Sequence, residues 1–385
     1  MGADGLDLLR QRCAEVPSVL RATLAAPVPS LDAVARRTRW VVTGAGASEG
    51  PGRLFAALLR RHLHACAGFV PLSAFAPERA ADVTDPSAVL VVISQGLAPN
   101  ARLALARTAS FAACVVVTAA PEHPGLADVR ALGAVVVGHP PGDESGLLLR
   151  VQGPAAATMM LLRVVDALCA ARGDAPPFDG HLDAVPDGLP DDEPTLDDRS
   201  AALASAGRVA IVTCDPGLEL AHGLRWKWLE GPATCDPPCW DALQMVHGPL
   251  QHLLERPRLL LALEPEGDPG AGALLDRLAS IVGDGHPMRR LRARTAGVAG
   301  FFDYDARSTT RSSPTLSAPR VTASARVTSP AHSAVGKSLD SMPSSRPARS
   351  SAAVRVSASR SMRRHTPSST RKTRTVGVDG AVSVS

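Results

Sequence analysis

Residues 89–96 read VLVVISQG and residues 40–48 read WVVTGAGAS. In both stretches a short run of apolar residues stops abruptly at small and polar residues. Such runs of Val, Leu and Ile are typical of strands in a parallel sheet that is buried on both faces. Parallel sheets bind ligands beyond the carboxyl ends of their strands, so backbone N–H groups and a serine hydroxyl at these turns could hold an anion or sugar hydroxyls.

Strands and helices alternate around these stretches. The first series has expected strands at 40–43, 69–72, 89–93, 114–118 and 134–138, and helices at 52–66, 101–109 and 155–171. A shorter series follows, with strands at 208–213, 258–263 and 291–297 and helices at 218–230, 240–255 and 271–282. This alternation predicts an α/β protein of two lobes, each a parallel sheet flanked by helices in a flavodoxin-like three-layer arrangement.

The length of 385 residues suits two such lobes. We expect an N-terminal helix at 1–25, a first lobe at 26–173, an acidic Pro-rich linker at 174–199, a second lobe at 200–302 and a disordered basic Ser/Arg-rich tail at 303–385. Ala306–Ser385 contains 14 of the 41 Lys and Arg residues and 2 of the 37 Asp and Glu residues. The net charge of +4 therefore divides into −8 for the body and +12 for the tail, so it does not argue for a nucleic-acid-binding fold.

Residues 306–385 of this tail lack Ile, Phe, Tyr, Trp, Cys and Glu and have only two Leu residues, so they cannot bury enough apolar surface to fold. Two alternatives stay open for this tail. A reading-frame shift near residue 305 would produce such a composition, and a basic tail could bind RNA or a membrane surface.

Seven cysteines are scattered along the chain, several of them inside apolar runs, which is typical of reduced thiols in a cytoplasmic protein. The N-terminus is not a signal peptide, and no window approaches 18 uninterrupted apolar residues, so no membrane span is expected. Cys235 and Cys239 with Cys214 and His222 lack the paired spacing of a zinc site. Gly44-x-Gly46 lacks the third glycine of a dinucleotide-binding turn, so neither a metal nor a cofactor is expected.

Both halves resemble the sugar isomerase (SIS) domain family, which includes the isomerase half of glucosamine-6-phosphate synthase, a glutamine–fructose-6-phosphate aminotransferase. Over residues 30–300, Gly44-Ala45-Gly46-Ala47-Ser48 matches the family's Gly-x-Gly-Ser/Thr-Ser turn, and Ser94-Gln95 opens its Ser-Gln-Ser-Gly-Glu-Thr turn. Gly96 replaces the second serine, and Leu97-Ala98-Pro99 replaces Gly-Glu-Thr, so two hydroxyls expected on a sugar phosphate are missing. The resemblance implies sugar contacts from Gly46, Ser48, Ser94 and Gln95, with Asn100 in place of one lost hydroxyl. Helix capping is the alternative role for these side chains.

In the second half, Leu224–Glu230 resembles the family's Leu-Lys-Leu-Lys-Glu helix, whose glutamate is the isomerisation base. Leu243–Leu250 resembles its Leu-Lys-His-Gly-Pro-Leu segment, whose histidine assists opening of the sugar ring. The resemblance therefore implies Glu230 as the base and His247 as the ring-opening residue. A solvated helix-end glutamate and a structural histidine are the alternatives. Trp226, Trp228 and Trp240 are expected in the core or at a dimer contact.

Together these features predict a cytoplasmic protein that binds a sugar or sugar phosphate and acts as an aldose–ketose isomerase or an amino-sugar isomerase or deaminase. The alternative is a non-catalytic sugar-sensing module with the same fold. A homodimer is expected because SIS lobes usually complete their pockets across a dimer. The N-terminal cysteine nucleophile of a glutaminase is missing, so the complete synthase reaction is not expected.

Overall fold

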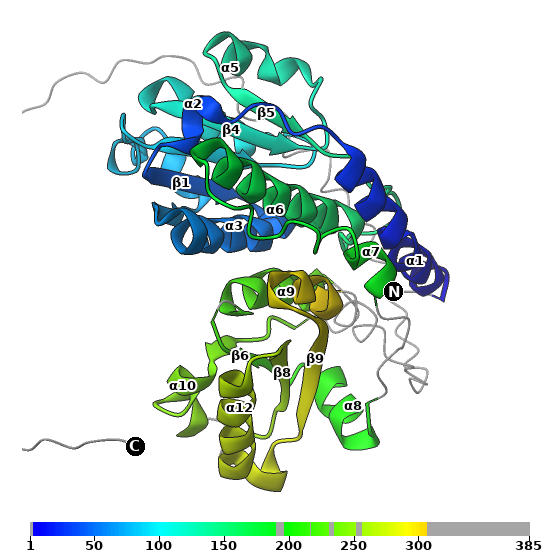
Figure 1. Cartoon of the computed structure of the whole chain (residues 1–385). Helices are drawn as coiled ribbons and strands as arrows, with labels where there is room; N and C mark the ends of the chain where they lie inside the picture. The colour runs from blue at the N-terminus through cyan, green and yellow to red at the C-terminus, as the bar shows by residue number, and fades with distance from the viewer. Residues whose placement is uncertain (1–2, 190–195, 216, 231–234, 252–255, 306–385) are drawn as a thin grey trace, which may run out of the picture. The chain divides into compact units, whose positions relative to one another are not determined.

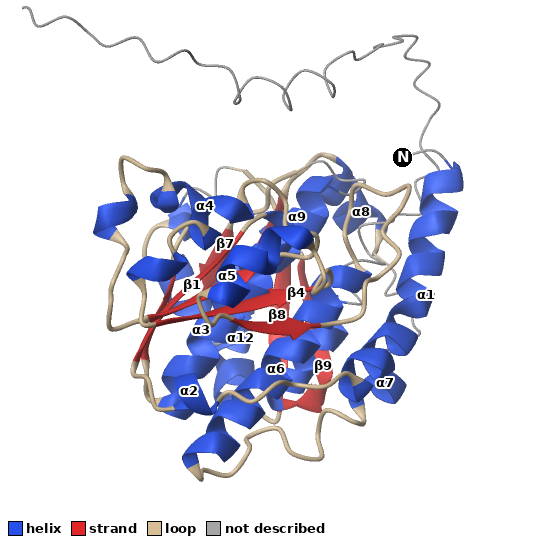
Figure 2. Cartoon of the chain, turned by 90° about the horizontal axis from the view of Figure 1, so that it is seen from above, coloured by secondary structure: helices blue, strands red, loops and turns tan. Residues whose placement is uncertain are grey.

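A computed structural model of the chain describes residues 3–189, 196–215, 217–230, 235–251 and 256–305, which belong to one compact unit (Figures 1 and 2). Residues 306–385 of the tail predicted at 303–385 lie outside these residues. The described residues form two parallel sheets, as the alternating sequence pattern predicted.

The first sheet has five strands in the order β2-β1-β3-β4-β5, all parallel. Its strands are β1 (Arg39–Gly44), β2 (Cys66–Phe69), β3 (Val89–Ile93), β4 (Ala113–Thr118) and β5 (Val135–Gly138). This is the flavodoxin order, in which the chain reverses its direction of winding between β1 and β3. The crevice beyond the carboxyl ends of those two strands is where ligands of such sheets bind.

Helices cover both faces of this sheet. On one face, β-strand residues such as Val42, Val91 and Val117 join a core with α3 (Glu49–Leu63), α6 (Gln152–Arg172) and the N-terminal α1 (Ala3–Ala25). On the other face, Leu90 and Val116 pack against α4 (Ala101–Leu105), α5 (Ala127–Ala131) and the turn η2 (Leu72–Phe75). Both faces are buried, which explains why the strand sequences are continuously apolar.

The second sheet repeats this plan with four parallel strands in the order β7-β6-β8-β9. They are β6 (Val209–Thr213), β7 (Cys239–Asp241), β8 (Leu259–Glu266) and β9 (Met288–Ala296). Ala210 and Val212 face α10 (Ala242–Met245) and α12 (Pro269–Val282). On the opposite face, Val209 packs with Trp228 of α9 (Gly217–Glu230). The direction of winding of this second sheet reverses between β6 and β8.

The two lobes meet where α3 lies against α9 (Figure 1). The helices approach so closely that a Cβ added at Gly50 would lie 2.5 Å from the Cα of Gly223. Arg60 forms an ion pair with Glu219 at one end of this contact, at 3.4 Å. At the other end the indole N–H of Trp226 donates to Glu49, at 3.0 Å. The helices are therefore antiparallel, with the amino end of α3 beside the carboxyl end of α9.

Three segments differ from the sequence expectation. Much of the predicted linker packs on the first lobe, where Phe178, Leu182 and Val185 are buried and α7 (Val185–Gly188) forms. The helix expected from residue 240 is preceded by the short edge strand β7, which includes Trp240. Ordered structure also continues past residue 302, because Asp303, Tyr304 and Asp305 are helical and buried.

Helix α6 is long and apolar enough to cross a membrane by length and composition. The sequence prediction did not select it, because polar residues interrupt its apolar run. In the structure 72% of its apolar window is buried within the protein. Its side chains fill the core between the first sheet and α1, so the apolar composition is accounted for by its position as a core helix.

Candidate functional site

The turn after β1 lies directly beside the end of β3, at the switch point of the first sheet. A Cβ at Gly44 would lie 3.1 Å from both the Ile93 carbonyl oxygen and the Ser48 Cβ, so any larger residue would crowd these two turns. Gly46 has φ of +55°, which glycine adopts without strain, and it begins the turn η1 (Gly46–Ser48). The structure therefore brings the two turns that the sequence singled out to one place.

Ser48 and Ser94 are both buried at this switch point, with exposed fractions of 6% and 8%. The Ser94 N–H donates to the Val117 carbonyl, which extends the β3–β4 pairing past the assigned strand. Neither hydroxyl makes a hydrogen bond with any residue in the described part of the chain. Neither serine caps a helix through its side chain there, so both hydroxyls are left to bind a ligand or water.

Three further polar atoms at the carboxyl edge of the first sheet are buried without a hydrogen-bond partner among the described residues. They are Thr43 Oγ1 at the end of β1, Gln95 Nε2 beyond β3, and His139 Nε2 beyond β5. His139 Nδ1 lies 3.0 Å from the Pro140 carbonyl, so that nitrogen donates and Nε2 is an acceptor in the neutral ring. Burial lowers the pKa of His139, which favours that neutral form.

Thr43 and His139 did not stand out in the sequence, although both directly follow apolar strand residues. Buried polar atoms without partners are rare in folded proteins, and a bound ligand or water usually satisfies them. This sheet edge therefore has the character of a ligand site, with Gln95 as a donor and His139 as an acceptor.

The amino end of α6, near Gln95, already holds a carboxylate. The Glu144 carboxylate accepts hydrogen bonds from the backbone N–H groups of Val151 and Gly153, at 3.2 and 2.7 Å. The Gln95 side chain packs directly against Gly153, leaving no room there for a Cβ. The amino end of α6 is therefore already occupied by the protein's own anion, whereas the Ser48 and Ser94 hydroxyls at the β1 and β3 turns are not engaged by any described residue.

The rest of the second turn departs from a sugar-phosphate cradle. Gly96 and Pro99 are exposed, and Asn100 is exposed with no side-chain cap on α4. Leu97 is 2% exposed and has φ of +50°, an unusual value for leucine. Leu97 thus anchors the turn in the core while Asn100 lies on the surface, and the predicted replacement of a lost hydroxyl by Asn100 remains a prediction.

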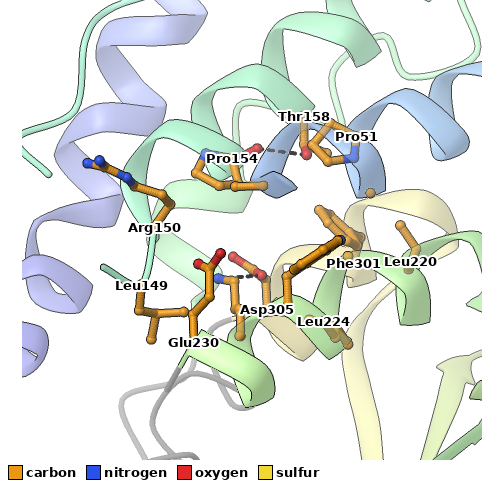
Figure 3. Close-up of a pocket in the computed structure, with 15 residues that line it drawn as sticks. Pro51, Leu149, Arg150, Pro154, Thr158, Leu220, Leu224, Glu230, Phe301 and Asp305 are labelled. Carbon is orange, nitrogen blue, oxygen red and sulfur yellow. Dashed lines mark hydrogen bonds and ion pairs between the residues drawn. The ribbon is translucent and has the colours of Figure 1, made fainter. Parts of the chain in front are cut away.

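Glu230, at the end of α9, lines a small cavity between the lobes (Figure 3). Ala47 of the β1 turn, Arg150, and Pro154 and Thr158 of α6 line the same cavity. The structure therefore places the predicted base beside the β1 turn. The space measures about 20 Å³, enough for roughly one water molecule.

The charges around Glu230 suit a group that exchanges protons. Burial raises the pKa of Glu230, and the positive charge of Arg150 partly opposes this rise. Beside it, Lys227 and Asp305 form a buried ion pair at 2.6 Å, with side chains 5% and 10% exposed. The side chains of Glu230 and Asp305 point into the same space (Figure 3). Lys227, Asp305 and Arg150 were not identified from the sequence, since only folding brings them to Glu230.

Aligned without a gap, the family's Leu-Lys-Leu-Lys-Glu helix would place its glutamate at Trp228. Trp228 is 1% exposed and packs against the second sheet, so that face of α9 belongs to the core. Glu230 is two residues further on, about 200° around the helix, on the face toward the cavity. Of the two positions, only Glu230 can meet a ligand.

His247 lies elsewhere. It is exposed, in the turn after α10, and α10 covers the face of the second sheet opposite to α9. The lining of the Glu230 cavity does not include it among the described residues. The structure therefore does not bring the two predicted catalytic residues together within one chain.

No group of three or more His, Cys, Asp or Glu side chains that could hold a metal is found in the described ranges. The Cys239 thiol instead donates to the Ala221 carbonyl at 3.3 Å, and burial raises its pKa to about 12.

No protein-family model and no curated protein sequence matches this chain. Several solved structures do. The C-terminal domain of glucosamine-fructose-6-phosphate aminotransferase from Francisella tularensis matches with a TM-score of 0.61 and 11% identity, over 79% of this chain and 94% of that one. Tagatose-6-phosphate ketose/aldose isomerase from Escherichia coli matches with a TM-score of 0.57 and 14% identity, over 79% and 92%.

Glucosamine-6-phosphate deaminase from Thermotoga maritima matches with a TM-score of 0.55 and 12% identity, over 80% of this chain and 93% of that one. The chain thus has the two-lobed α/β fold of SIS-domain sugar-phosphate proteins, and the resemblance expected from the sequence is confirmed at the level of the fold.

Proposed function

We propose that this protein binds a sugar phosphate at the β1–β3 switch point of its first lobe and interconverts its aldose and ketose forms. The proposal is supported most by one observation. Glu230, a carboxylate whose pKa is raised by burial, lies on one cavity with Ala47 of the β1 turn. The solved structures named above are of proteins that act on sugar phosphates, which agrees with this class of ligand.

In this proposal Ser48 and Ser94 donate hydrogen bonds to phosphate oxygens, together with backbone N–H groups of the β1 turn. Gln95 donates its buried amide N–H to a sugar oxygen, and Gly46 allows the backbone to approach the ligand closely. Asn100 contacts the ligand only if the exposed second turn folds over it.

The reaction requires a proton to move between adjacent carbons of the open-chain sugar. The Glu230 carboxylate removes the proton from C2 of the aldose, which leaves an enediolate with its charge on O1. A proton then passes from O2 to O1, and Glu230 returns its own proton to C1 to give the ketose. A carboxylate with a raised pKa is a better acceptor for such a proton than an ordinary one. Lys227, held by Asp305 beside it, keeps positive charge near the developing enediolate oxygen.

In this proposal His247 opens the sugar ring. Within one chain His247 and Glu230 lie on opposite faces of the second sheet, so the histidine at each site comes from a second copy of the chain. The homodimer predicted from the sequence would supply it. A neutral imidazole can move a hydroxyl proton near pH 7.

Turnover of a panel of hexose and amino-sugar phosphates, screened first by thermal shift, tests the proposal. Glu230→Gln should lower turnover by roughly 10²-fold or more while leaving ligand binding measurable. Glu219→Gln, on the same helix but paired with Arg60, is the matched control. Binding without turnover by the unaltered chain would overturn the enzymatic part.

The shared site has its own test. In an equal mixture of Glu230→Gln and His247→Asn chains, half of the dimers are mixed and one of the two sites in each is intact. About a quarter of the original activity should therefore return. No recovery, in a sample that light scattering shows to be dimeric, would place His247 outside the site.

A non-catalytic sugar-binding module is the second candidate function. It is favoured by the size of the Glu230 cavity, about 20 Å³, since a sugar carbon can reach the carboxylate only if α6 and α9 move apart. A tight complex with a sugar phosphate whose affinity is unchanged in Glu230→Gln, and which is never turned over, would support this candidate.

A further inference from the structure

A large cavity lies at the strand ends of the second lobe, at a position equivalent to the site discussed above. It has a volume of about 490 Å³, within the range of small-molecule sites. Thr213 and Asp215 at the end of β6 line it together with Glu266 at the end of β8, so it occupies the β6–β8 switch point. Ligands of open parallel sheets bind at such a point.

Elements of the first lobe close this cavity. Leu54, Arg61 and His62 of α3 form one wall, and the segment from Pro177 to His181 forms another. Phe178 is fixed there, because its N–H donates to Asp166 of α6 at 2.9 Å and its ring meets His62 edge-on, with centroids 5.4 Å apart. The cavity is thus already formed, which lowers the entropic cost of binding.

Acceptors predominate among the charged groups of the lining. Three carboxylates line the cavity, those of Asp215, Glu266 and Asp268, against one guanidinium, that of Arg61. Asp268 is partly committed, since it accepts from the Ala271 N–H at 2.9 Å. The Asp215 and Glu266 carboxylates make no hydrogen bond or ion pair with any other residue that the structure describes, so both are available to a ligand.

The remaining walls are apolar. Leu54, Leu220 and Phe301 lie across from the strand ends, and Phe178 adds an aromatic edge. A ligand that fits must therefore offer donors on one side and a C–H surface on the other. His62 adds little positive charge to the lining near pH 7, because burial lowers its pKa.

We propose that the second-lobe cavity is a separate ligand site for a small, hydroxyl-rich amine of aminohexose size. The ammonium group pairs with Asp215 and Glu266, hydroxyls donate to the remaining carboxylate oxygens, and the ring packs on the apolar walls. A phosphate is disfavoured by the excess of carboxylates. This site is independent of the proposed function of the first lobe.

Isothermal titration of the full chain with glucosamine tests the proposal. One saturable site per chain is expected, weakened roughly tenfold or more in Asp215→Asn/Glu266→Gln, because hydrogen bonds to charged groups are the strong ones. Both side chains are exposed, so the double variant should fold, which its thermal unfolding midpoint will show. Asp128→Asn/Glu122→Gln, two exposed carboxylates outside the cavity, is the matched control.

Titrations with two further sugars test which groups of the ligand are recognised. Glucose lacks the amine of glucosamine, and glucosamine 6-phosphate adds a phosphate. We expect glucose and glucosamine 6-phosphate to bind this site more weakly than glucosamine, so that Asp215→Asn/Glu266→Gln leaves the affinity of the chain for either of them unchanged. That result would support recognition of an unphosphorylated amine. Equal affinity for glucose and glucosamine would overturn the role of the ammonium group. No binding of glucosamine, or binding lost in Ser48→Ala rather than in the double variant, would overturn the site itself.

Discussion

The switch points of the two sheets have the same topology and opposite chemistry. At β1–β3 the chain presents hydroxyls and an amide on a glycine-rich turn, from Ser48, Ser94 and Gln95, and little open volume is left beside Glu230. At β6–β8 it presents the carboxylates of Asp215 and Glu266 around about 490 Å³ of open space. One backbone plan thus carries hydroxyl and amide groups at the strand ends of one lobe and carboxylates at those of the other.

The two cavities also share the α3–α9 helix pair as part of their walls. The Glu230 cavity lies at the amino end of α3 and the carboxyl end of α9, and the second-lobe cavity lies at the opposite end of the same helix pair. Leu220 and Phe301 line both. A change in the spacing of α3 and α9 must therefore reach both cavities, and the experiments below separate what the sites share from what distinguishes them.

The largest effect is expected from Gly50→Ala. The new Cβ would meet the Gly223 backbone at 2.5 Å, so α3 and α9 must separate, at a cost of about 2 kcal/mol in the free energy of unfolding. Urea unfolding measures this cost. Gly68→Ala, which has no heavy atom within 4 Å of its Cβ, should cost about 0.5 kcal/mol or less. Equal stability of the two variants would show that the lobes do not depend on this contact.

Ser48→Ala and Ser94→Ala test whether the two serine hydroxyls of the first site donate hydrogen bonds to the ligand. Each removes one hydroxyl whose proposed partner is a charged phosphate oxygen, so each should weaken sugar-phosphate binding roughly tenfold. Titration calorimetry measures the loss, with the exposed Ser73→Ala as the control. If both variants bind as tightly as the unaltered chain, the phosphate lies elsewhere.

Asp166 accepts a hydrogen bond from the Phe178 N–H at the wall of the second cavity, and its own titration makes the stability of the protein sensitive to pH. Burial raises its pKa from 3.8 to about 6, despite the hydrogen bond from Phe178, which lowers it. The folded state therefore binds more protons than the unfolded state between these values, and the free energy of unfolding falls as pH rises through this window.

After allowance for solvent screening of a half-exposed group, this contribution is about 1 kcal/mol. Asp166→Asn should remove it, which urea unfolding at about pH 4 and pH 7 will show. The same pH dependence in the variant and in the unaltered chain would assign it to other groups.

The smallest effect is expected from Gly96→Ser, which restores a hydroxyl to the second turn. A Cβ at this position meets nothing within 4 Å, and the residue is exposed, so the serine fits without strain. Sugar-phosphate affinity should rise about fivefold, the value of one ordinary hydrogen bond. Gly68→Ser is the control, and no gain over it would show that the ligand does not reach this turn.

Short-range patterns in the sequence predicted the position of the first site. Apolar runs that end in Gly44–Ser48 and in Ser94-Gln95 specify buried strands and turns, and parallel pairing places their ends together. The strand β7 was missed because its three residues, Cys239–Asp241, follow two prolines and include no Val or Ile. Residues 174–189 resemble a linker in composition, yet three apolar residues within them anchor the segment to the first lobe.

The sequence by itself determined the α/β class, the two lobes and the polar strand ends, because these depend on periodicity and on turn residues close together along the chain. Only the tertiary structure decided which side chains meet. It turned Glu230 toward a cavity and Trp228 into the core, left His247 on the far face of its sheet, and placed α3 against the strand ends of the second lobe. Such contacts join residues that are far apart along the chain, and local patterns do not encode them.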